Sequence, residues 1–304
     1  MGPDPRRSAP RIRGAALTRF SCCAAIDWSG AAGPRQRGIA VALCEPGTAA
    51  PRLIRPGHIW SRGEVLGWLR EDLPPDTLVG LDLGPSLPFA DRGAFFPGWN
   101  RSPPDARALW ALVDELAAAD PHLAATAFVD HPEASRHFRR HGGRTGDCFG
   151  TGRGRLRVTE QAQREQGLNP YSNMNLVGAA QVGKSSLTGM RLFHRLSGAL
   201  PFWPFDPDPG TGSLLVEIYT SIAALAAGRS KGRTKMTTYE ALDTALARLG
   251  SEAVGGTGPV SDHVTDAILT AAWLRTAASR PELWHPPALT LEIAATEGWT
   301  FGVT

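Results

Sequence analysis

Long apolar runs, paired cysteines and lysines are all scarce in this chain of 304 residues. No stretch approaches about 18 uninterrupted apolar residues, so we expect no membrane-spanning helix. The four cysteines show no C-x-x-C spacing, which argues against a disulfide framework and against a zinc ribbon. The first residues contain basic side chains but no apolar segment of the kind that a secretory signal needs. We therefore expect a soluble protein of the reducing cytoplasm.

Positive charge is unevenly distributed along the chain. The formal net charge is +3, yet residues 1–20 carry five arginines against one aspartate. We expect residues 1–20 to form a disordered basic tail ahead of a nearly neutral body. Only three lysines occur, and the positive charge of the body gathers in the Gly-rich segments 136–164 and 229–235. These segments could contact phosphate groups, or they could be solvated loops.

Short apolar runs indicate the strands of an α/β protein. Four of them predict strands, at 21–27, 38–44, 52–60 and 77–82. Pro56 marks the third as an edge strand or a bulge. Ser61 and Glu64 have the spacing of a capping box, which predicts a helix between the third and fourth strands.

The segment 83–212 is rich in loops, and we interpret it as an insertion because no low-complexity linker bounds it. Helices are expected within it at 104–119, 131–140 and 185–198. Further elements are expected after it: a strand at 213–219, helices at 238–249 (capped by Thr237) and 261–278, and a closing strand at 299–303. The prediction is a single α/β domain over residues 21–304, with a mixed sheet and the order β-β-β-α-β-α-β-α.

Acidic residues stand where strands end and where the last long helix begins. Asp27, Asp82 and Glu217 each lie at or near the end of an apolar run. Asp262 and Asp266 are spaced i and i+4 at the start of the 261–278 helix, with His263 beside them. Ligands of open α/β sheets bind at the carboxyl ends of the strands, so these side chains are expected to converge there.

Converging carboxylates repel one another unless a cation lies between them. Carboxylate oxygens with few imidazoles suit Mg²⁺ or Mn²⁺, and two such ions can activate water in phosphodiester hydrolysis. The predicted metal ligands are Asp27, Asp82, Glu217, Asp262 and Asp266. The alternative for each acid is a structural one, in which it caps a helix or lies in a solvated loop.

Six segments of the chain together resemble a known bacterial family. They are AIDWSGA (25–31), GLDLGPSLP (80–88), QVGKSSLTGMRLFHRL (181–196), LLVEIYTS (214–221), DHVTDAILTAAWL (262–274) and EGWTFGV (297–303). In order and combination they resemble the family of unknown function labelled a predicted RNase H-like nuclease, whose acids follow the RuvC-type pattern. The resemblance implies an RNase H-like core that carries 83–212 as an insertion.

The resemblance also implies roles for individual residues. Asp27 and Asp82 match the acids after the first and fourth strands, and His263 and Asp266 match the H-x-x-D of the last helix. Glu217 matches the family's V-E-x-Y segment, which has no simple counterpart in the RuvC scheme. The implied function is a metal-dependent nuclease that acts on nucleic acid or another phosphoester, with these five residues as its catalytic set.

A second motif predicts phosphate binding. Residues 178–185 satisfy the P-loop pattern G-x-x-x-x-G-K-[ST], but the preceding NPYSNMNLV is a poor buried strand. The predicted phosphate-binding residues are Gly183, Lys184, Ser185, Lys231 and Arg233. Two other readings stay open: a nucleotide hydrolase or phosphotransferase that uses Lys184, and a binding module without catalysis.

Tryptophan is abundant, with nine residues. Trp28, Trp110 and Trp273 fall at positions typical of a core. Trp99 and Trp203 fall in loop-like sequence, where they could stack on nucleic-acid bases.

Overall fold

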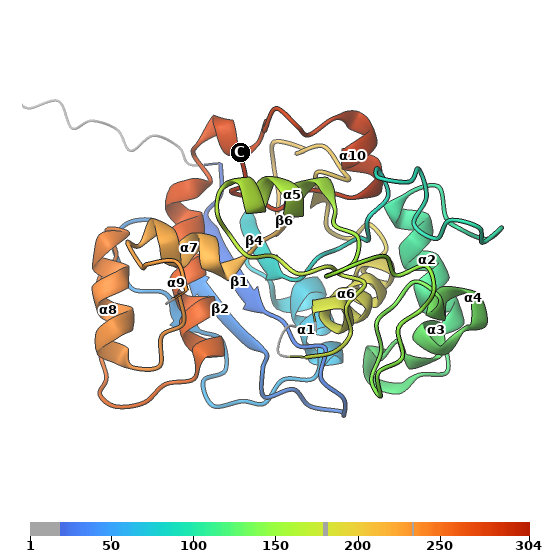
Figure 1. The fold of residues 1–304 in the computed structure, drawn as a ribbon. Coiled ribbons are helices and arrows are strands. Elements are labelled where there is room, and N and C mark those ends of the chain that lie inside the picture. Colours follow the sequence, from blue (N-terminus) through green and yellow to red (C-terminus); the bar gives the residue numbers. More distant parts are fainter. Residues whose placement is uncertain (1–18, 179–181, 233) are drawn as a thin grey trace, which may run out of the picture.

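A mixed sheet forms the centre of the computed structural model, which describes residues 19–178, 182–232 and 234–304 (Figure 1). The six strands of this described part follow the order β3 (Arg52–Leu53), β2 (Ala40–Cys44), β1 (Cys22–Asp27), β4 (Thr77–Asp82), β6 (Leu214–Glu217) and β5 (Phe202–Trp203). β1 pairs antiparallel with β2 and parallel with β4, and β6 is parallel to β4. The α/β class and the mixed sheet are therefore confirmed. Residues 1–18 of the predicted tail lie outside the described part.

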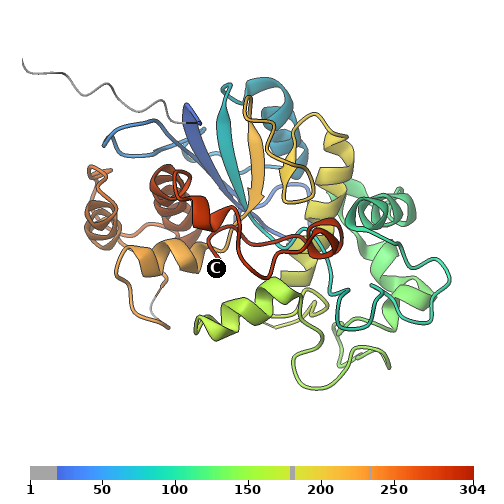
Figure 2. The same ribbon diagram turned by 90° about the horizontal axis from the view of Figure 1, so that it is seen from above.

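Side chains along the strands alternate between two hydrophobic cores, one on each face of the sheet. In β1, Ala24 and Ile26 belong to one core, whereas Cys23 and Ala25 belong to the other. This alternation follows from the two-residue repeat of a strand. Both faces are apolar because helices cover both of them, as in other buried sheets (Figure 2). The repeat directs Asp27 to the same face as Cys23 and Ala25.

That face is covered by α7 (Thr220–Ala226), α8 (Tyr239–Arg248) and α9 (Asp262–Ala277). α9 packs along β1 and β2 and against α7. Ser261 caps α9 by accepting a hydrogen bond from the Val264 amide at 3.3 Å. The start of α9, which carries the predicted Asp262, His263 and Asp266, is thereby fixed beside the end of β1.

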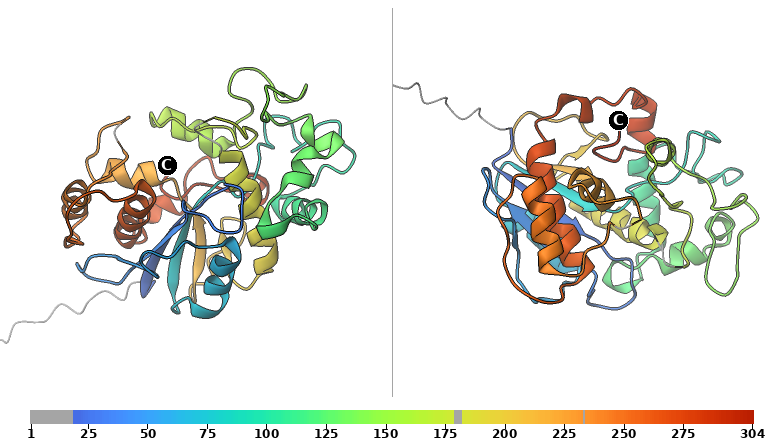
Figure 3. Two further views of the ribbon diagram at one scale, coloured as in Figure 1. Left: turned by 90° about the horizontal axis from the view of Figure 1, so that it is seen from below. Right: turned by 60° about the vertical axis from the view of Figure 1, so that its left-hand side comes forward.

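The opposite face is covered by α1 (Arg62–Gly67) and α6 (Val182–Leu196), and α2 (Ala106–Leu116) packs on α6. The capping box of Ser61 and Glu64 is present as predicted. The short helices α3 (Thr126–Asp130) and α4 (Pro132–Ser135) lie beyond α6, on the side of the molecule away from α8 (Figure 3).

The segment 83–212 is part of the same sheet and core. It contributes β5, which pairs with β6 at the sheet edge, and α6, which covers one face. Its α5 (Val158–Glu165) was not predicted, and the expected 131–140 helix ends with α4 at Ser135. Trp99 and Trp203 are each 7% exposed, so the base stacking that their loop-like sequence allowed is not supported.

Several predicted boundaries also differ from the structure. The third strand is only β3, with an isolated bridge between Gln36 and Trp60, and residues 299–303 contribute one bridge between Glu217 and Thr300. α8 is capped by Thr238 and not by Thr237. The remaining helices are α10 (Leu291–Thr296), the π-helix η1 (Trp68–Asp72) and the 3-10 turns η2 (Pro121–Leu123) and η3 (Pro281–Leu283).

Candidate functional site

Asp27 and Asp82 lie side by side at the carboxyl ends of β1 and β4. The two strands run parallel, and Asp27 is the register partner of Asp82. Partners in a sheet point to the same face, and the two-residue repeat directs both side chains to the face that α9 covers. Asp27 is 6% exposed and Asp82 is partly buried. The two acids predicted from separate apolar runs are thus brought together.

The first two turns of α9 supply a histidine and two more acids. The Nδ1 atom of His263 lies 2.7 Å from Oδ2 of Asp27, which makes a hydrogen-bonded pair between α9 and β1. Asp266, one turn further along the same helix, is buried, whereas Asp262 is partly exposed. The helix therefore presents the predicted H-x-x-D pair toward the strand-end acids.

Lys235 provides a cation within this group of acids, which we call the acid cluster (Asp27, Asp82, Asp262 and Asp266). Its Nζ atom lies 2.6 Å from Oδ2 of Asp266 and 3.4 Å from Oδ2 of Asp262. The Lys235 side chain is 60% exposed, so it reaches the buried Asp266 from the solvent side. We expected Lys235 to serve only as a basic loop residue. Its ion pairs with Asp262 and Asp266 are a finding of the structure.

The ionisation of the acid cluster is strongly perturbed. Burial raises the pKa of Asp82 well above its usual value, and the neighbouring carboxylates of Asp27 and Asp266 add to the shift. Burial likewise raises the pKa of Asp27, although His263 opposes the shift. Burial raises the pKa of Asp266 to about 6 even with Lys235 in contact. Burial thus opposes the ionisation of Asp27, Asp82 and Asp266 at the end of the sheet.

Carboxylate oxygens of this kind fit a hard divalent cation, but they do not converge on one point. Within the described parts of the chain, no three His, Cys, Asp or Glu side chains are grouped so that they could hold a metal ion. Asp266 instead directs an oxygen at Lys235, and Asp27 directs one at His263. The predicted metal ligation by Asp27, Asp82, Asp262 and Asp266 stays a prediction.

Glu217 is separated from the acid cluster, and its predicted place among the metal ligands needs correction. Its oxygens lie 2.6 and 2.9 Å from the Arg157 guanidinium, and Thr300 Oγ1 donates to it at 2.8 Å. The reason is the strand register: Glu217 pairs with Leu81, one residue short of Asp82, so it faces the opposite side of the sheet. Glu217 belongs to a buried ion pair that anchors the start of α5.

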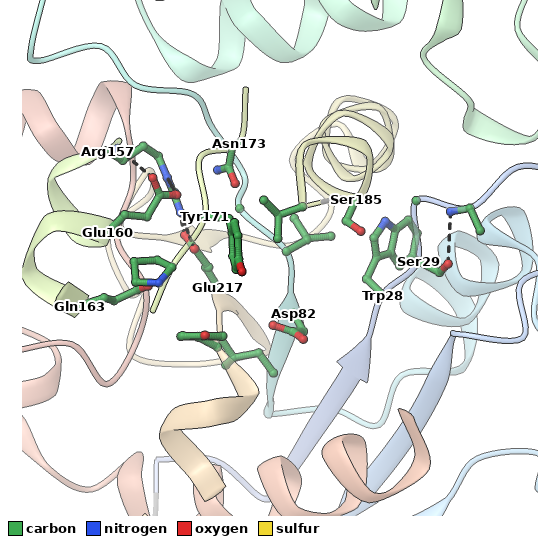
Figure 4. Close-up of a pocket in the computed structure, with 18 of the residues that line it drawn as sticks. Trp28, Ser29, Asp82, Arg157, Glu160, Gln163, Tyr171, Asn173, Ser185 and Glu217 are labelled. Carbon is green, nitrogen blue, oxygen red and sulfur yellow. Dashed lines mark hydrogen bonds and ion pairs between the residues drawn. The ribbon is translucent and has the colours of Figure 1, made fainter. Parts of the chain in front are cut away.

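A cavity of about 480 Å³ connects these two groups. Asp82 and Lys235 line one part of it, and Arg157 and Glu217 line another. In Figure 4, Tyr171 lies between Asp82 and the Arg157–Glu217 pair. Sequence reasoning missed further wall residues of this cavity: Tyr171, Asn173 and Tyr219. Trp28 and Ser29 were within reach of prediction, because they follow Asp27 directly in the AIDWSGA segment.

Trp28 confirms its predicted place in the core while it also lines this cavity. It is 5% exposed, and its Nε1 donates to Thr188 Oγ1 of α6 at 3.0 Å. Trp110 and Trp273 are buried as well. The wall next to the end of β1 is therefore tied to α6 by the hydrogen bond between Trp28 and Thr188.

The P-loop prediction is not supported by the geometry around Gly183. No strand precedes α6 in residues 163–178, which the structure describes in full. The Gly183 amide donates to the Asn175 carbonyl at 3.1 Å, and a Cβ at this position would lie 2.4 Å from the Asn173 carbonyl oxygen. Gly183 therefore packs against backbone and cannot offer its amide to a phosphate, which corrects its predicted role.

The other predicted phosphate ligands are spread over different places. Ser185 lines the 480 Å³ cavity, and Lys184 lines a second cavity. Lys231 donates from Nζ to the Gln166 carbonyl at 3.3 Å, at the end of α5. Arg233 and residues 179–181 of the P-loop pattern lie outside the described residues.

Comparison of the chain with protein-family models, with curated proteins and with solved structures gave no match in any of the three. In the part of the chain that the structure describes, every helix is too short or too polar to cross a membrane. What the chain does must therefore be argued from the geometry of its own residues.

Proposed function

We propose that this chain is a divalent-metal-dependent hydrolase of phosphodiester bonds, with nucleic acid as its substrate. The observation that carries the proposal is the pairing of Asp27 with Asp82 on adjacent parallel strands, with Asp266 from α9 close enough to raise the pKa of Asp82. Carboxylates gathered at the carboxyl ends of strands suit Mg²⁺ or Mn²⁺. The element order and the antiparallel β1–β2–β3 start support the RNase H-like reading of the fold.

In this proposal Asp27, Asp82 and Asp266 hold the metal. The bound ion would lower the pKa of a water molecule and neutralise charge on the phosphate. Asp266 would exchange its contact with Lys235 for the ion, and the largely exposed Lys235 side chain has room to turn toward solvent or toward the substrate phosphate. Asp262, whose side chain is 37% exposed, contacts Lys235 at 3.4 Å.

His263 is placed to carry a proton. Its hydrogen bond to Asp27 is the main cause that raises the pKa of His263 above the ordinary value. The imidazole is 40% exposed, so its Nε2 edge can reach a substrate. We assign it the transfer of a proton to the leaving oxygen, while Asp27 fixes the orientation of the ring through Nδ1.

A nucleotide phosphotransferase finds less support. The P-loop pattern follows no strand in the described residues, and its Gly183 amide is already bonded to Asn175. A phosphate-cradling loop needs free backbone amides at this position.

The experiment that tests the proposal measures metal binding and cleavage on the same variants. Asp82→Asn should abolish Mn²⁺ binding in calorimetry and reduce cleavage of single- and double-stranded DNA and RNA about a hundredfold or more. Because Asp82 is held at a strongly raised pKa, the neutral amide should leave the fold at least as stable as before. Loss of cleavage would then not reflect unfolding.

The matched control is Asp72→Asn, which changes an acid whose side chain is 57% exposed and lies outside the cluster. It should bind Mn²⁺ and cleave as the wild type does. If the wild type binds no Mn²⁺ at millimolar concentration, or if Asp82→Asn cleaves normally, the proposal is wrong.

A further inference from the structure

A second cavity, of about 240 Å³, shares Gly30 and Ala31 with the 480 Å³ cavity, which Asp82 lines and which we call the acid-lined cavity. The charged side chains of the second cavity are mostly cationic. We infer that it binds a phosphate group of the nucleic-acid strand at a distance from the bond that is cleaved. We call it the basic cavity, after the residues that line it: Arg62, Arg140, His141, Arg144 and Lys184. The inference rests on the proposed function, because it assigns this cavity to the same polymeric substrate.

The charge of the basic cavity favours an anion. Four cationic side chains line it, and Asp130 is its only carboxylate among the residues that the structure describes. Asp130 is already engaged by Arg140 at 3.0 Å. Within the described ranges, Arg144 and Lys184 have no carboxylate within ion-pair distance, so their charges are available to a ligand.

Hydrogen-bond donors of the basic cavity are also free or weakly used. The Nε atom of Arg140 is buried and has no hydrogen-bond partner in the described part of the structure. Lys184 Nζ donates to Nε2 of the neighbouring His141 at 2.8 Å, which leaves two of its three protons. Burial lowers the pKa of Lys184, the sign of a cation that lacks a compensating anion. A phosphate would supply the acceptor oxygens that these groups lack.

The wall of the basic cavity is rigid. The buried Arg62 donates to the Ser29 carbonyl at 3.0 Å, to the Ala31 carbonyl at 2.5 Å and to the His122 carbonyl at 2.8 Å. All three acceptors are uncharged carbonyl groups, so these contacts bring no negative charge that would neutralise the Arg62 guanidinium. Ala31 also donates from its amide to Ser29 Oγ at 3.2 Å (Figure 4). The loop between the two cavities is thereby fixed before any ligand arrives.

The two cavities lie on either side of one short loop. Gly30 and Ala31 line both of them. Consecutive residues of α6 divide between them, since Ser185 faces the acid-lined cavity and Lys184 the basic one. A Cβ on Gly30 would lie 2.4 Å from the Ser185 amide nitrogen, so glycine allows the loop to rest on α6. A nucleic-acid strand can cross this loop with one phosphate near the acid cluster and another in the basic cavity.

Binding of an oligonucleotide without divalent metal tests the inference. Fluorescence anisotropy with a labelled 12-nucleotide single strand, as DNA and as RNA, in EDTA would give Kd over a range of salt concentrations. Lys184→Ala and Arg144→Ala should each weaken binding about tenfold, and each should reduce the log–log salt slope by about 0.7. Arg144→Lys, which keeps the charge, should retain the slope. Arg101→Ala is the matched control, since Arg101 is exposed and pairs with Glu115 on α2.

Equal affinity and equal slope in Lys184→Ala, Arg144→Ala and wild type would overturn the inference. Failure of the wild type to bind either oligonucleotide would also overturn it. Cleavage is not part of this measurement, so the two proposals can fail separately. A protein that binds through Lys184 and Arg144 but hydrolyses nothing with Mn²⁺ would keep the phosphate site and lose the proposed activity. Thermal unfolding of each variant shows whether its fold is retained.

Discussion

Lys235 is the residue whose charge offsets the acid cluster in the absence of metal. Its ammonium contacts Asp266 and Asp262, and although burial opposes the shift, Asp266 raises the pKa of Lys235 above its ordinary value. The two partners are unequal, because Lys235 is largely exposed whereas Asp266 is buried. Removal of the ammonium would leave Asp266 without a counter-charge, and this cost falls on the folded state alone.

We therefore predict that Lys235→Gln lowers the free energy of unfolding at pH 7 by about 1–2 kcal/mol, a value reduced by the solvent exposure of the lysine. Urea denaturation in EDTA measures it. Millimolar Mn²⁺ should restore most of the loss, because the proposed ion takes over the neutralising role. Lys231→Gln is the control, since Lys231 contacts only a backbone carbonyl at the end of α5 among the described residues. Equal stability of Lys235→Gln and wild type would contradict this account.

The sequence was sufficient to predict the acid cluster at the level of residues, but not its partners. Asp27 and Asp82 were predicted because each follows an apolar run, and Asp266 because helical spacing joins it to His263. Glu217 also lies near the end of an apolar run, yet its assignment to the metal ligands needed correction. Whether β6 pairs Glu217 with Leu81 or with Asp82 decides which face it points to, and register depends on packing across strands that are distant in the chain.

At the scale of elements, the contact between the loop after β1 and the first turn of α6 positions both cavities. Gly30 meets the backbone of Lys184 and Ser185 at this contact, and a Cβ there would lie 2.5 Å from the Lys184 carbonyl carbon. Backbone atoms of a helix cannot move aside to make room for a Cβ, whereas the end of a flexible side chain can. Any larger residue must push the loop and α6 apart.

Gly30→Ala should therefore lower the free energy of unfolding by about 1–3 kcal/mol, the usual cost of overpacking. It should also weaken oligonucleotide binding, because both cavity walls move. Gly67→Ala provides the contrast: it lies in α1, has no atom within 4 Å of an added Cβ and has no positive φ. It should stabilise the protein by about 0.5–1 kcal/mol. Denaturation curves of the two variants that shift in the same direction would refute the proposed contact.

Elements with local signals were predicted well, and elements that depend on distant partners were not. β4 was predicted with the bounds it has, and the capping box of α1 needs only Ser61 and Glu64. β5 contains two residues and exists because β6 offers an edge to pair with. α5 follows Arg157, whose charge is satisfied by Glu160 and Glu217. Nothing in the neighbouring sequence of 83–212 indicates either partner across the fold.

At the scale of the whole molecule, buried groups on the two sides of the fold respond to pH in opposite directions. Burial lowers the pKa of His137 to about 4, and its Nδ1 has no hydrogen-bond partner in the described structure. At a pH below 6.5, the ordinary pKa of histidine, His137 takes up a proton in the unfolded chain but not in the folded protein. The free energy of unfolding therefore decreases as the pH is lowered from 6.5 to about 4. Asp266 has a pKa of about 6 in the folded protein and 3.8 as its ordinary value, so the folded state binds this proton at a higher pH than the unfolded chain does. Its contribution to the free energy of unfolding therefore increases as the pH is lowered from about 6 to 3.8.

The two contributions can be separated by substitution. A shift from 6.5 to about 4 corresponds to about 3 kcal/mol, fully expressed below pH 4. His137→Gln should therefore gain about 3 kcal/mol of stability relative to wild type when the pH falls from 8 to 4. Asp266→Asn should lose a similar amount relative to wild type over the same range, because its pKa shift has the opposite sign. Urea denaturation at each pH measures both differences, and subtraction of the wild-type curve removes groups common to all three proteins. A difference between His137→Gln and wild type that does not change with pH would show that His137 has the same pKa in the folded and unfolded states, and the lowered pKa of the buried imidazole would have to be abandoned.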